Sequence, residues 1–271
     1  MLSLAIVYAG VALLAPLFAL AERRWPERAS PHRLRALDVA YWLVVTPIVT
    51  GVLTRGATMG ALGVTAYAVA SSDPQTFLAR LHAASPLGGL PFAAQLGLAL
   101  LVADVVGYFS HRIRHRGVFW WFHAIHHSAT TLDAQAAARM HPIDDMLDNV
   151  LVGGAVLAMG LSPEVFLALG PIILLHTLLT HANVAWDFGP LRWVLVSPAF
   201  HRWHHALDRA GARGCNYAGM FSFVDLLGGT FHLPRAEAPE AFGSGEAIPE
   251  TVLGQLAWPW RALGRSLKAR G

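Results

Sequence analysis

The stretch HRIRHRGVFWWFHAIHHS, which runs from His111 to Ser128, places five histidines within seventeen residues. The first two, His111 and His115, are four residues apart, so on a helix they lie on the same face. The last three form an H-x-x-H-H pattern, whose spacing also converges on one side of a helix. Neutral imidazole is a common transition-metal ligand, and histidines packed this densely are destabilising without a shared partner. The stretch therefore predicts helices that carry a metal site.

The same H-x-x-H-H spacing recurs near the C-terminal end, and His181 lies between the two motifs. Eight or nine imidazoles exceed what one ion can use, so the sequence predicts two ions that share the ligands. Imidazole suits zinc, copper, iron and nickel, and composition alone does not choose among them. His141, which precedes a proline, is a possible additional ligand, whereas His176 is interpreted as a core or membrane-lining residue. The predicted ligands are His111, His115, His123, His126, His127, His181, His201, His204 and His205.

The composition places this chain in a membrane. Of its 271 residues, 55% are hydrophobic and only 14% are charged, with a mean hydropathy of +0.46, which is more apolar than an ordinary soluble domain. The single cysteine, Cys215, excludes an internal disulfide and a cysteine-rich metal site. The small positive charge comes mostly from arginines in short loops, so we interpret it as a topology signal and expect no nucleic-acid partner.

Apolar runs predict an all-α, multi-pass bundle of about four to five membrane segments, with a cytoplasmic helical cap that holds the histidine-rich di-metal site. Arginines at positions 23–35 and around His111 place the metal-bearing face in the cytoplasm, as in a bacterial inner membrane or its equivalent. Residues 1–91 are expected to form a membrane-anchor region, 92–234 a catalytic domain and 235–271 a cytoplasmic tail. The predicted segments are 2–21, 36–53 (broken at Pro47), 92–110 and a hairpin of 147–161 and 163–180, with 56–70 left open.

Asp104 lies inside the third predicted segment, seven residues before His111 and eleven before His115. These separations are two and three helical turns, so the carboxylate shares the stripe of the two histidines. An ionisable residue within a membrane segment is a functional candidate, although a helix-packing hydrogen bond near the interface is the alternative.

The histidine motifs, together with the shorter motifs around them, occur in an order that resembles that of the fatty acid hydroxylase/sterol desaturase superfamily. The resemblance extends over roughly residues 98–234, half of the chain. The motifs that carry it are H-R-x-x-H (His111–His115), W-x-x-H-x-x-H-H-S (Trp120–Ser128), R-x-H-P (Arg139–Pro142), H-x-N (His181–Asn183), S-P-x-x-H-R-x-H-H (Ser197–His205), N-Y (Asn216–Tyr217) and D-x-x-x-G-T (Asp225–Thr230).

The resemblance implies an integral-membrane enzyme whose histidine-bound di-iron centre activates O2 to oxidise a fatty acyl chain, a sterol or a related lipid. The nine histidines would then be iron ligands, and Asp104 and Asn183, with Asp187, Asp208 and Asp225, are candidates for the groups that orient them. No haem-binding H-P-G-G, dinucleotide-binding G-x-G-x-x-G or cysteine cluster occurs. Electrons are therefore expected from a separate cytochrome, ferredoxin or flavoprotein reductase.

Several alternatives stay open. Hydroxylation is preferred over desaturation because it needs only one hydrogen within reach of the iron. A histidine-rich metal transporter is disfavoured, since transporters place their ligands near the bilayer midplane and these clusters adjoin arginine-rich interfacial sequence. A metal-dependent hydrolase would usually use fewer histidines and include a carboxylate ligand or base.

Overall fold

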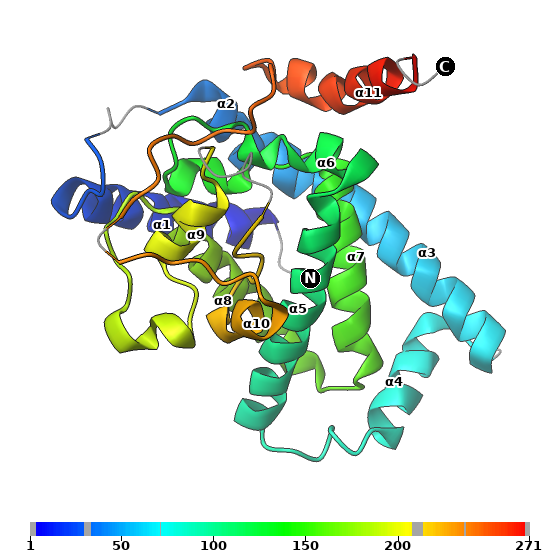
Figure 1. The fold of residues 1–271 in the computed structure, drawn as a ribbon. Helices are drawn as coiled ribbons and strands as arrows, with labels where there is room; N and C mark the ends of the chain where they lie inside the picture. Colours follow the sequence, from blue (N-terminus) through cyan, green and yellow to red (C-terminus); the bar gives the residue numbers. More distant parts are fainter. Residues whose placement is uncertain (1–3, 30–33, 71, 208–213, 236, 269–271) are drawn as a thin grey trace.

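The computed structural model describes residues 4–29, 34–70, 72–207, 214–235 and 237–268 (Figure 1). Among these residues the secondary structure is helical with no strand, as the sequence predicts. The elements are α1 (Leu4–Arg24), α2 (Ala36–Ala40), the π-helix η1 (Tyr41–Thr50), α3 (Gly51–Ala70), α4 (Pro74–Ala84), α5 (Phe92–Arg114), α6 (Gly117–His123), the 3₁₀ turns η2 (His126–Ser128) and η3 (Ala134–Ala138), α7 (Pro142–Ala158), α8 (Pro163–His181), the 3₁₀ turn η4 (Gly189–Trp193), α9 (Pro198–His204), α10 (Ser222–Gly228) and α11 (Val252–Lys268).

Three helices of the described chain are long and apolar enough to cross a membrane: Ala36–Ala70, Phe92–Arg114 and Pro163–His181. In each, less than a third of the most apolar window is buried within the chain. Apolar side chains that face outward along a whole helix require lipid rather than water around them. The chain is therefore an integral membrane protein, as its composition predicts.

The predicted break at Pro47 is wrong. The segments α2, η1 and α3 form one continuous helix of 35 residues, about 52 Å long at 1.5 Å per residue. Proline removes one backbone donor and crowds the preceding turn, and the π-helical stretch Tyr41–Thr50 accommodates it without ending the helix. Residues 56–70, whose status the sequence leaves open, belong to the same helix as residues 36–53. The whole helix is therefore longer than the roughly 30 Å hydrocarbon core of a bilayer.

The central helix is α5, which packs against both α7 and α8. Small residues on α5, Ala99 and Ala103, are buried against Val156 and Val165, so the helices approach closely. Helix α7 begins at Pro142, earlier than the predicted segment at 147, and Asp144 and Asp145 lie in its first turn. Proline at the first position and carboxylates in the first turn both favour a helix start.

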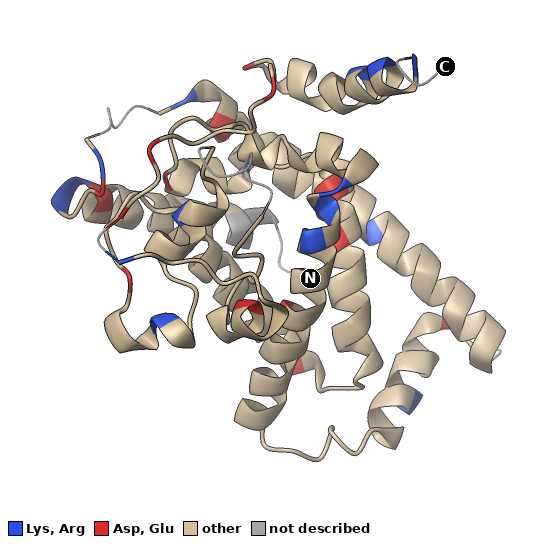
Figure 2. Cartoon of the chain, in the orientation of Figure 1, with Lys and Arg blue, Asp and Glu red and all other residues tan. Residues whose placement is uncertain are grey.

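Helices α6 and α11 lie at the end of α5 that carries Arg114. Helix α6 follows α5 there, and α11 packs on α6 (Figure 1). Figure 2 shows that charged residues are sparse on the opposite halves of α5 and α7 and more frequent among the loops and short helices of this end. The histidines lie in this polar part of the fold, next to the apolar bundle.

Candidate metal centre

The structure brings all nine predicted ligands together in two groups. In each group, one ring nitrogen of every histidine lies within 4.8 Å of the same type of atom on the others. The five-histidine group is His111, His115, His123, His127 and His204, and the four-histidine group is His126, His181, His201 and His205. Nearly all of these residues are buried, and both groups consist of histidine alone. Their role as ligands stays a prediction. The geometry adds that the nine residues form two groups, each with nitrogen atoms close enough together to hold a metal ion.

Each H-x-x-H-H motif is divided between the groups. In the first motif His126 belongs to the four-histidine group, whereas in the second motif His204 belongs to the five-histidine group. The expectation that the first motif lies on one helical face is wrong, because α6 ends at His123 and the next two histidines occupy η2. The groups adjoin, since the rings of His127 and His205 stack with centroids 4.4 Å apart.

The outward nitrogens of several rings contact backbone carbonyls. Nδ1 of His111 donates to the Tyr217 carbonyl at 2.8 Å, and Nδ1 of His204 donates to the Cys215 carbonyl at 2.9 Å. A carbonyl can only accept, so Nδ1 carries the proton and Nε2 presents a lone pair. The same arrangement holds for Nδ1 of His126 and His181, which donate to the carbonyls of residues 139 and 177.

The inward nitrogens therefore face one another as lone pairs. The Nε2 atoms of His126 and His181 are 3.3 Å apart, although both rings hold their protons on the other side. Nε2 of His204 and both ring nitrogens of His127 are buried without a hydrogen-bond partner. Converging, unprotonated acceptors repel each other unless a cation lies between them, so the donor set fits bound metal.

Burial keeps these imidazoles neutral. It lowers the pKa of His204 to about 3, and it lowers the pKa of His126 and His127 well below the ordinary histidine value. Since the neutral ring is the form that binds a metal, the electrostatics agree with the hydrogen bonds.

Asp144 is the functional residue that sequence reasoning missed. Its carboxylate accepts a hydrogen bond from Nδ1 of His123 at 2.8 Å and pairs with Arg114 at 3.2 Å. The pairing with the Arg114 guanidinium favours the charged form of this carboxylate. The ionised carboxylate fixes His123 with its Nε2 directed into the five-histidine group.

The carboxylate of Asp104 orients backbone rather than a histidine. It accepts hydrogen bonds from the N–H groups of Gly219, Met220 and Phe221 at 2.7–2.9 Å. Asp225 does the same for the N–H groups of residues 217 and 218, each at 2.8 Å. The two carboxylates thus hold residues 217–221. The carbonyls of Tyr217 and of the nearby Cys215 receive the ring protons of two predicted ligands.

Asn183, the other predicted orienting residue, also acts on backbone. Its side chain donates to the Arg28 carbonyl at 2.9 Å and accepts from Arg202, at 3.3 Å. Because Arg202 lies between two ligands on α9, Asn183 contributes to the position of that helix. Asp187 pairs with Arg192 at a more exposed place, and Asp208 lies outside the described residues.

Neither His141 nor His176 joins a group. His141 caps α7 by accepting from the Ile143 N–H at 3.2 Å, and its Nε2 donates to the Leu256 carbonyl of α11 at 3.2 Å. Both ring nitrogens are thereby used, which leaves none for a metal. His176 lies on α8 and borders a cavity instead.

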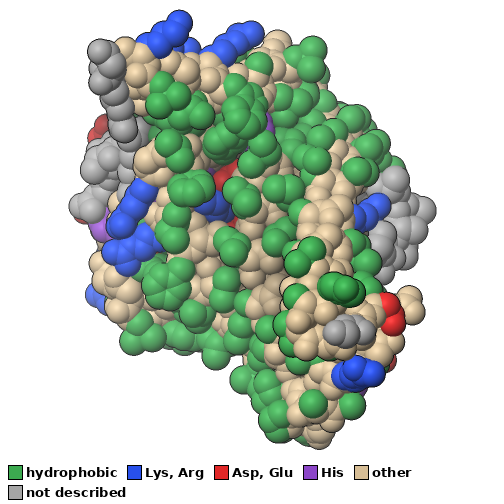
Figure 3. All heavy atoms as spheres, turned by 90° about the vertical axis from the view of Figure 1, so that its right-hand side faces the viewer, with side chains coloured by type: hydrophobic (Ala, Val, Ile, Leu, Met, Phe, Trp, Pro, Cys, Tyr) green, Lys and Arg blue, Asp and Glu red, His purple; other side chains and the backbone are tan. Residues whose placement is uncertain are grey.

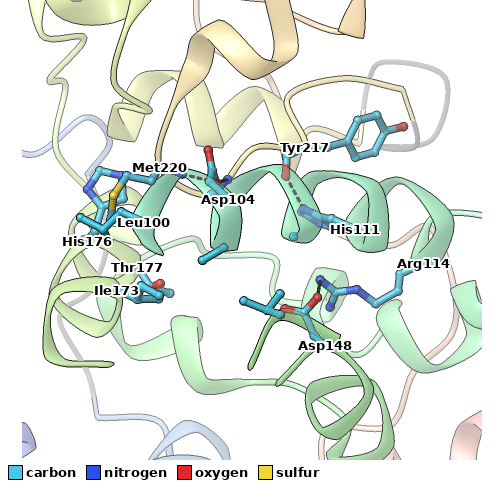
Figure 4. Close-up of a pocket in the computed structure, with 14 residues that line it drawn as sticks. Leu100, Asp104, His111, Arg114, Asp148, Ile173, His176, Thr177, Tyr217 and Met220 are labelled. Carbon is cyan, nitrogen blue, oxygen red and sulfur yellow. Dashed lines mark hydrogen bonds and ion pairs between the residues drawn. The ribbon is translucent and has the colours of Figure 1, made fainter. Parts of the chain in front are cut away.

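That cavity, of about 190 Å³, lies between α5, α7 and α8 (Figure 4). It is lined by apolar groups of Leu100, Val152 and Ile173, and it reaches the metal-group residue His111. In Figure 4 the ion pair of Arg114 and Asp148 lies toward one end and His176 toward the other. A pocket with apolar walls beside a buried group of histidines can hold a hydrocarbon chain.

Comparison with known proteins indicates the family of the chain. The model of the family described as fatty acid hydroxylase matches residues 96–230. The chain is 35% identical over 176 residues to the ornithine lipid hydroxylase OlsE of Rhizobium tropici, covering 65% of this chain and 53% of that protein. It is 29% identical over 178 residues to the alkylglycerol monooxygenase of Caenorhabditis elegans, covering 64% and 33%. It is 26% identical over 142 residues to a Delta(7)-sterol 5(6)-desaturase of Gibberella zeae, covering 52% and 38%.

The chain spans about half the length of the first of these relatives and a third of the second. No solved structure matches it significantly.

Proposed function

Because the chain belongs to the fatty acid hydroxylase/sterol desaturase superfamily, we propose that it is an O2-dependent di-iron oxygenase that hydroxylates a C–H bond of a lipid. The substrate would be a fatty acyl chain, a sterol or a related lipid. The observation that carries the proposal is the pair of adjoining histidine groups whose lone pairs converge. The five-histidine group would hold one iron and the four-histidine group the other, and the iron pair would supply O2 activation.

The chain's own residues would prepare this chemistry. Backbone carbonyls and Asp144 fix the protonated nitrogens on the outside, so the free nitrogens need no reorganisation when metal enters. Burial of the groups excludes bulk water, which protects a reactive oxidant from side reactions.

The cavity beside His111 would position the lipid. Its walls are apolar at Leu100, Val152 and Ile173, so they would bind an alkyl chain through burial of hydrocarbon surface. Two of its walls, α5 and α8, are candidate membrane spans, and a lipid would therefore enter sideways from the bilayer.

Desaturation by the same centre is the second candidate, and the sterol desaturase among the relatives favours keeping it. Both reactions begin by removing hydrogen from an unactivated carbon. They differ in whether oxygen is then transferred to that carbon or a second hydrogen leaves the neighbouring one, which depends on sub-ångström placement of the substrate.

The arrangement in the membrane belongs to the same proposal. Residues 92–234 would form the catalytic domain, within which the family match lies, preceded by the anchor region 1–91 and followed by 235–271. Helices α1 and α7 would join the three candidate spans to give four to five membrane segments. The metal-bearing face would lie in the cytoplasm, where a separate cytochrome, ferredoxin or flavoprotein reductase would deliver electrons.

The test supplies ¹⁸O2 to cells that express the chain and compares their lipids by mass spectrometry with those of cells expressing His126→Ala. A new lipid that carries one labelled oxygen atom, absent from the variant, is the expected result. A product that has lost two hydrogen atoms and carries no label would establish desaturation instead. Identical lipids in both strains, with two irons bound per chain, would contradict the proposal.

A further inference from the structure

The C-terminal helix α11, Val252–Lys268, presents three different faces along its length. One face packs on the protein: Gln255, Trp258 and Ala262 are buried, at the spacing of successive helical turns. Through this face α11 contacts α6, and Trp258 lies against Trp121 with ring centroids 6.0 Å apart. The helix is therefore fixed to the metal-bearing part of the fold rather than a loose tail.

The second face is apolar and exposed. Leu253, Trp260 and Leu267 follow each other at intervals of seven residues, so they form one stripe along the helix. Their side chains are 80%, 52% and 62% exposed, respectively. A continuous row of large apolar side chains in water is unfavourable, and such rows mark surfaces that bind a partner or a membrane.

The third face is basic. Arg261, Arg265 and Lys268 are exposed at intervals of four and three residues, and α11 contains no acidic residue. Figure 3 shows Lys and Arg side chains along the upper edge of the molecule, the end at which Figure 1 places α11, with hydrophobic side chains directly below them. A helix with parallel basic and apolar stripes matches the anionic headgroups and acyl chains of a bilayer surface.

The apolar stripe continues onto the neighbouring helix. The ring of Trp260 contacts Phe122 of α6 at a centroid distance of 5.1 Å, and one turn earlier α6 exposes Phe119. Helix α6 follows α5, a candidate membrane span, after a two-residue link. The exposed surface of α11 thus adjoins the end of a helix that crosses the membrane.

We infer that α11 is an interfacial helix that lies on a bilayer surface containing anionic lipids. Leu253, Trp260 and Leu267 enter the acyl boundary, and the three basic side chains bind phosphate-bearing headgroups. The bilayer is the occupant because a partner protein would have to match two parallel stripes that end at a membrane span. Through Gln255, which approaches Ser128 at 3.4 Å, the helix sets the position of the first H-x-x-H-H segment relative to the membrane. The inference does not depend on the reaction catalysed.

The experiment places a nitroxide spin label at single cysteines of the full chain, in a Cys215→Ser background reconstituted into nanodiscs. Leu253→Cys and Leu267→Cys report on the apolar stripe, and Arg265→Cys on the same helix is the matched control. Collision rates are measured with O2, which concentrates in hydrocarbon, and with a neutral nickel complex, which stays in water. Circular dichroism confirms that each labelled protein is folded.

The ratio of O2 to nickel collision rates should be at least about threefold higher at the two apolar positions than at the control. The difference should increase when about a third of the phosphatidylcholine is replaced by phosphatidylglycerol. In the variant Arg261→Gln/Arg265→Gln/Lys268→Gln, labelled at Leu253→Cys, the ratio of O2 to nickel collision rates should no longer increase when phosphatidylglycerol is added. Equal ratios at all three positions would show that α11 lies in water, and exclusion of both reagents from the apolar positions would show that a protein surface covers it. Either result would overturn the inference.

Discussion

Asp144→Asn isolates the contribution of a single carboxylate to one of the two histidine groups. Asp144 accepts from Nδ1 of His123 at 2.8 Å and from Arg114 at 3.2 Å, and both contacts are buried. Both donors contact the same carboxylate oxygen, Oδ2, so asparagine can keep both contacts through its amide oxygen but loses the negative charge that strengthens them. Hydrogen bonds to a charged group contribute about 1.5–3 kcal/mol and neutral ones about 0.5–1.5 kcal/mol, so the two contacts together lose about 2 kcal/mol. Since about 1.4 kcal/mol corresponds to a factor of ten, the iron held by the five-histidine group should bind roughly 10- to 100-fold more weakly.

The assay is chelator competition on the purified protein, with iron per chain counted at each chelator concentration. The variant should release one iron at lower chelator concentration and keep the other. Asp148→Asn is the matched control, because Asp148 also pairs with Arg114, at 3.1 Å, but has no contact with a predicted ligand. That control should release both irons as the unaltered chain does. Equal release from the two variants would refute the role assigned to Asp144.

Three further predictions concern the metals and the topology. His204→Ala and His126→Ala remove one ligand from each group, so each should lower iron below two per chain by elemental analysis while the protein stays in the membrane fraction; unchanged iron would contradict the ligand assignment. His141→Gln should keep two irons, because both ring nitrogens bond within the protein, and should lower the thermal midpoint by a few degrees; iron loss would make His141 a ligand. In sealed cells that express the chain in a Cys215→Ser background, an impermeant thiol reagent should label Gln75→Cys, which is exposed at the start of α4, but not Ser266→Cys. Labelling of Ser266→Cys without Gln75→Cys would invert the predicted topology.

The sequence indicates which histidines come together but not how they are divided. All nine predicted ligands lie in two adjoining groups, yet the helical-face rule does not describe the H-x-x-H-H motifs, because each motif contributes histidines to both groups. Their role as ligands stays a prediction. The apolar runs likewise mark the candidate spans, since length and hydropathy are properties of a continuous segment.

The sequence does not show the contacts that backbone groups and residues distant in the chain make with the histidines. The carbonyls of Cys215 and Tyr217 accept hydrogen bonds from the rings of His204 and His111. Every residue has a backbone carbonyl, so the residue type does not indicate which carbonyl accepts. Asp144 contacts His123 from another helix, 21 residues further along the chain, and no local spacing in the sequence links the two residues. Pro47 misleads for the converse reason: its usual helix-breaking effect depends on an α-helical neighbourhood, and here the helix widens around it.

The H-H dipeptides give a structural reason for the proposal of two ions rather than one. Adjacent residues on a helix point about 100° apart, so neighbouring imidazoles diverge. The rings of His126 and His127 stand at 89° to each other, and those of His204 and His205 at 90°. In each dipeptide one ring joins the five-histidine group and the other joins the four-histidine group. A single ion would not reach both rings, whereas two neighbouring ions would be held by the same two short segments. Any displacement of η2 or α9 moves histidines of both groups at once, which would couple the two proposed metal positions through the backbone.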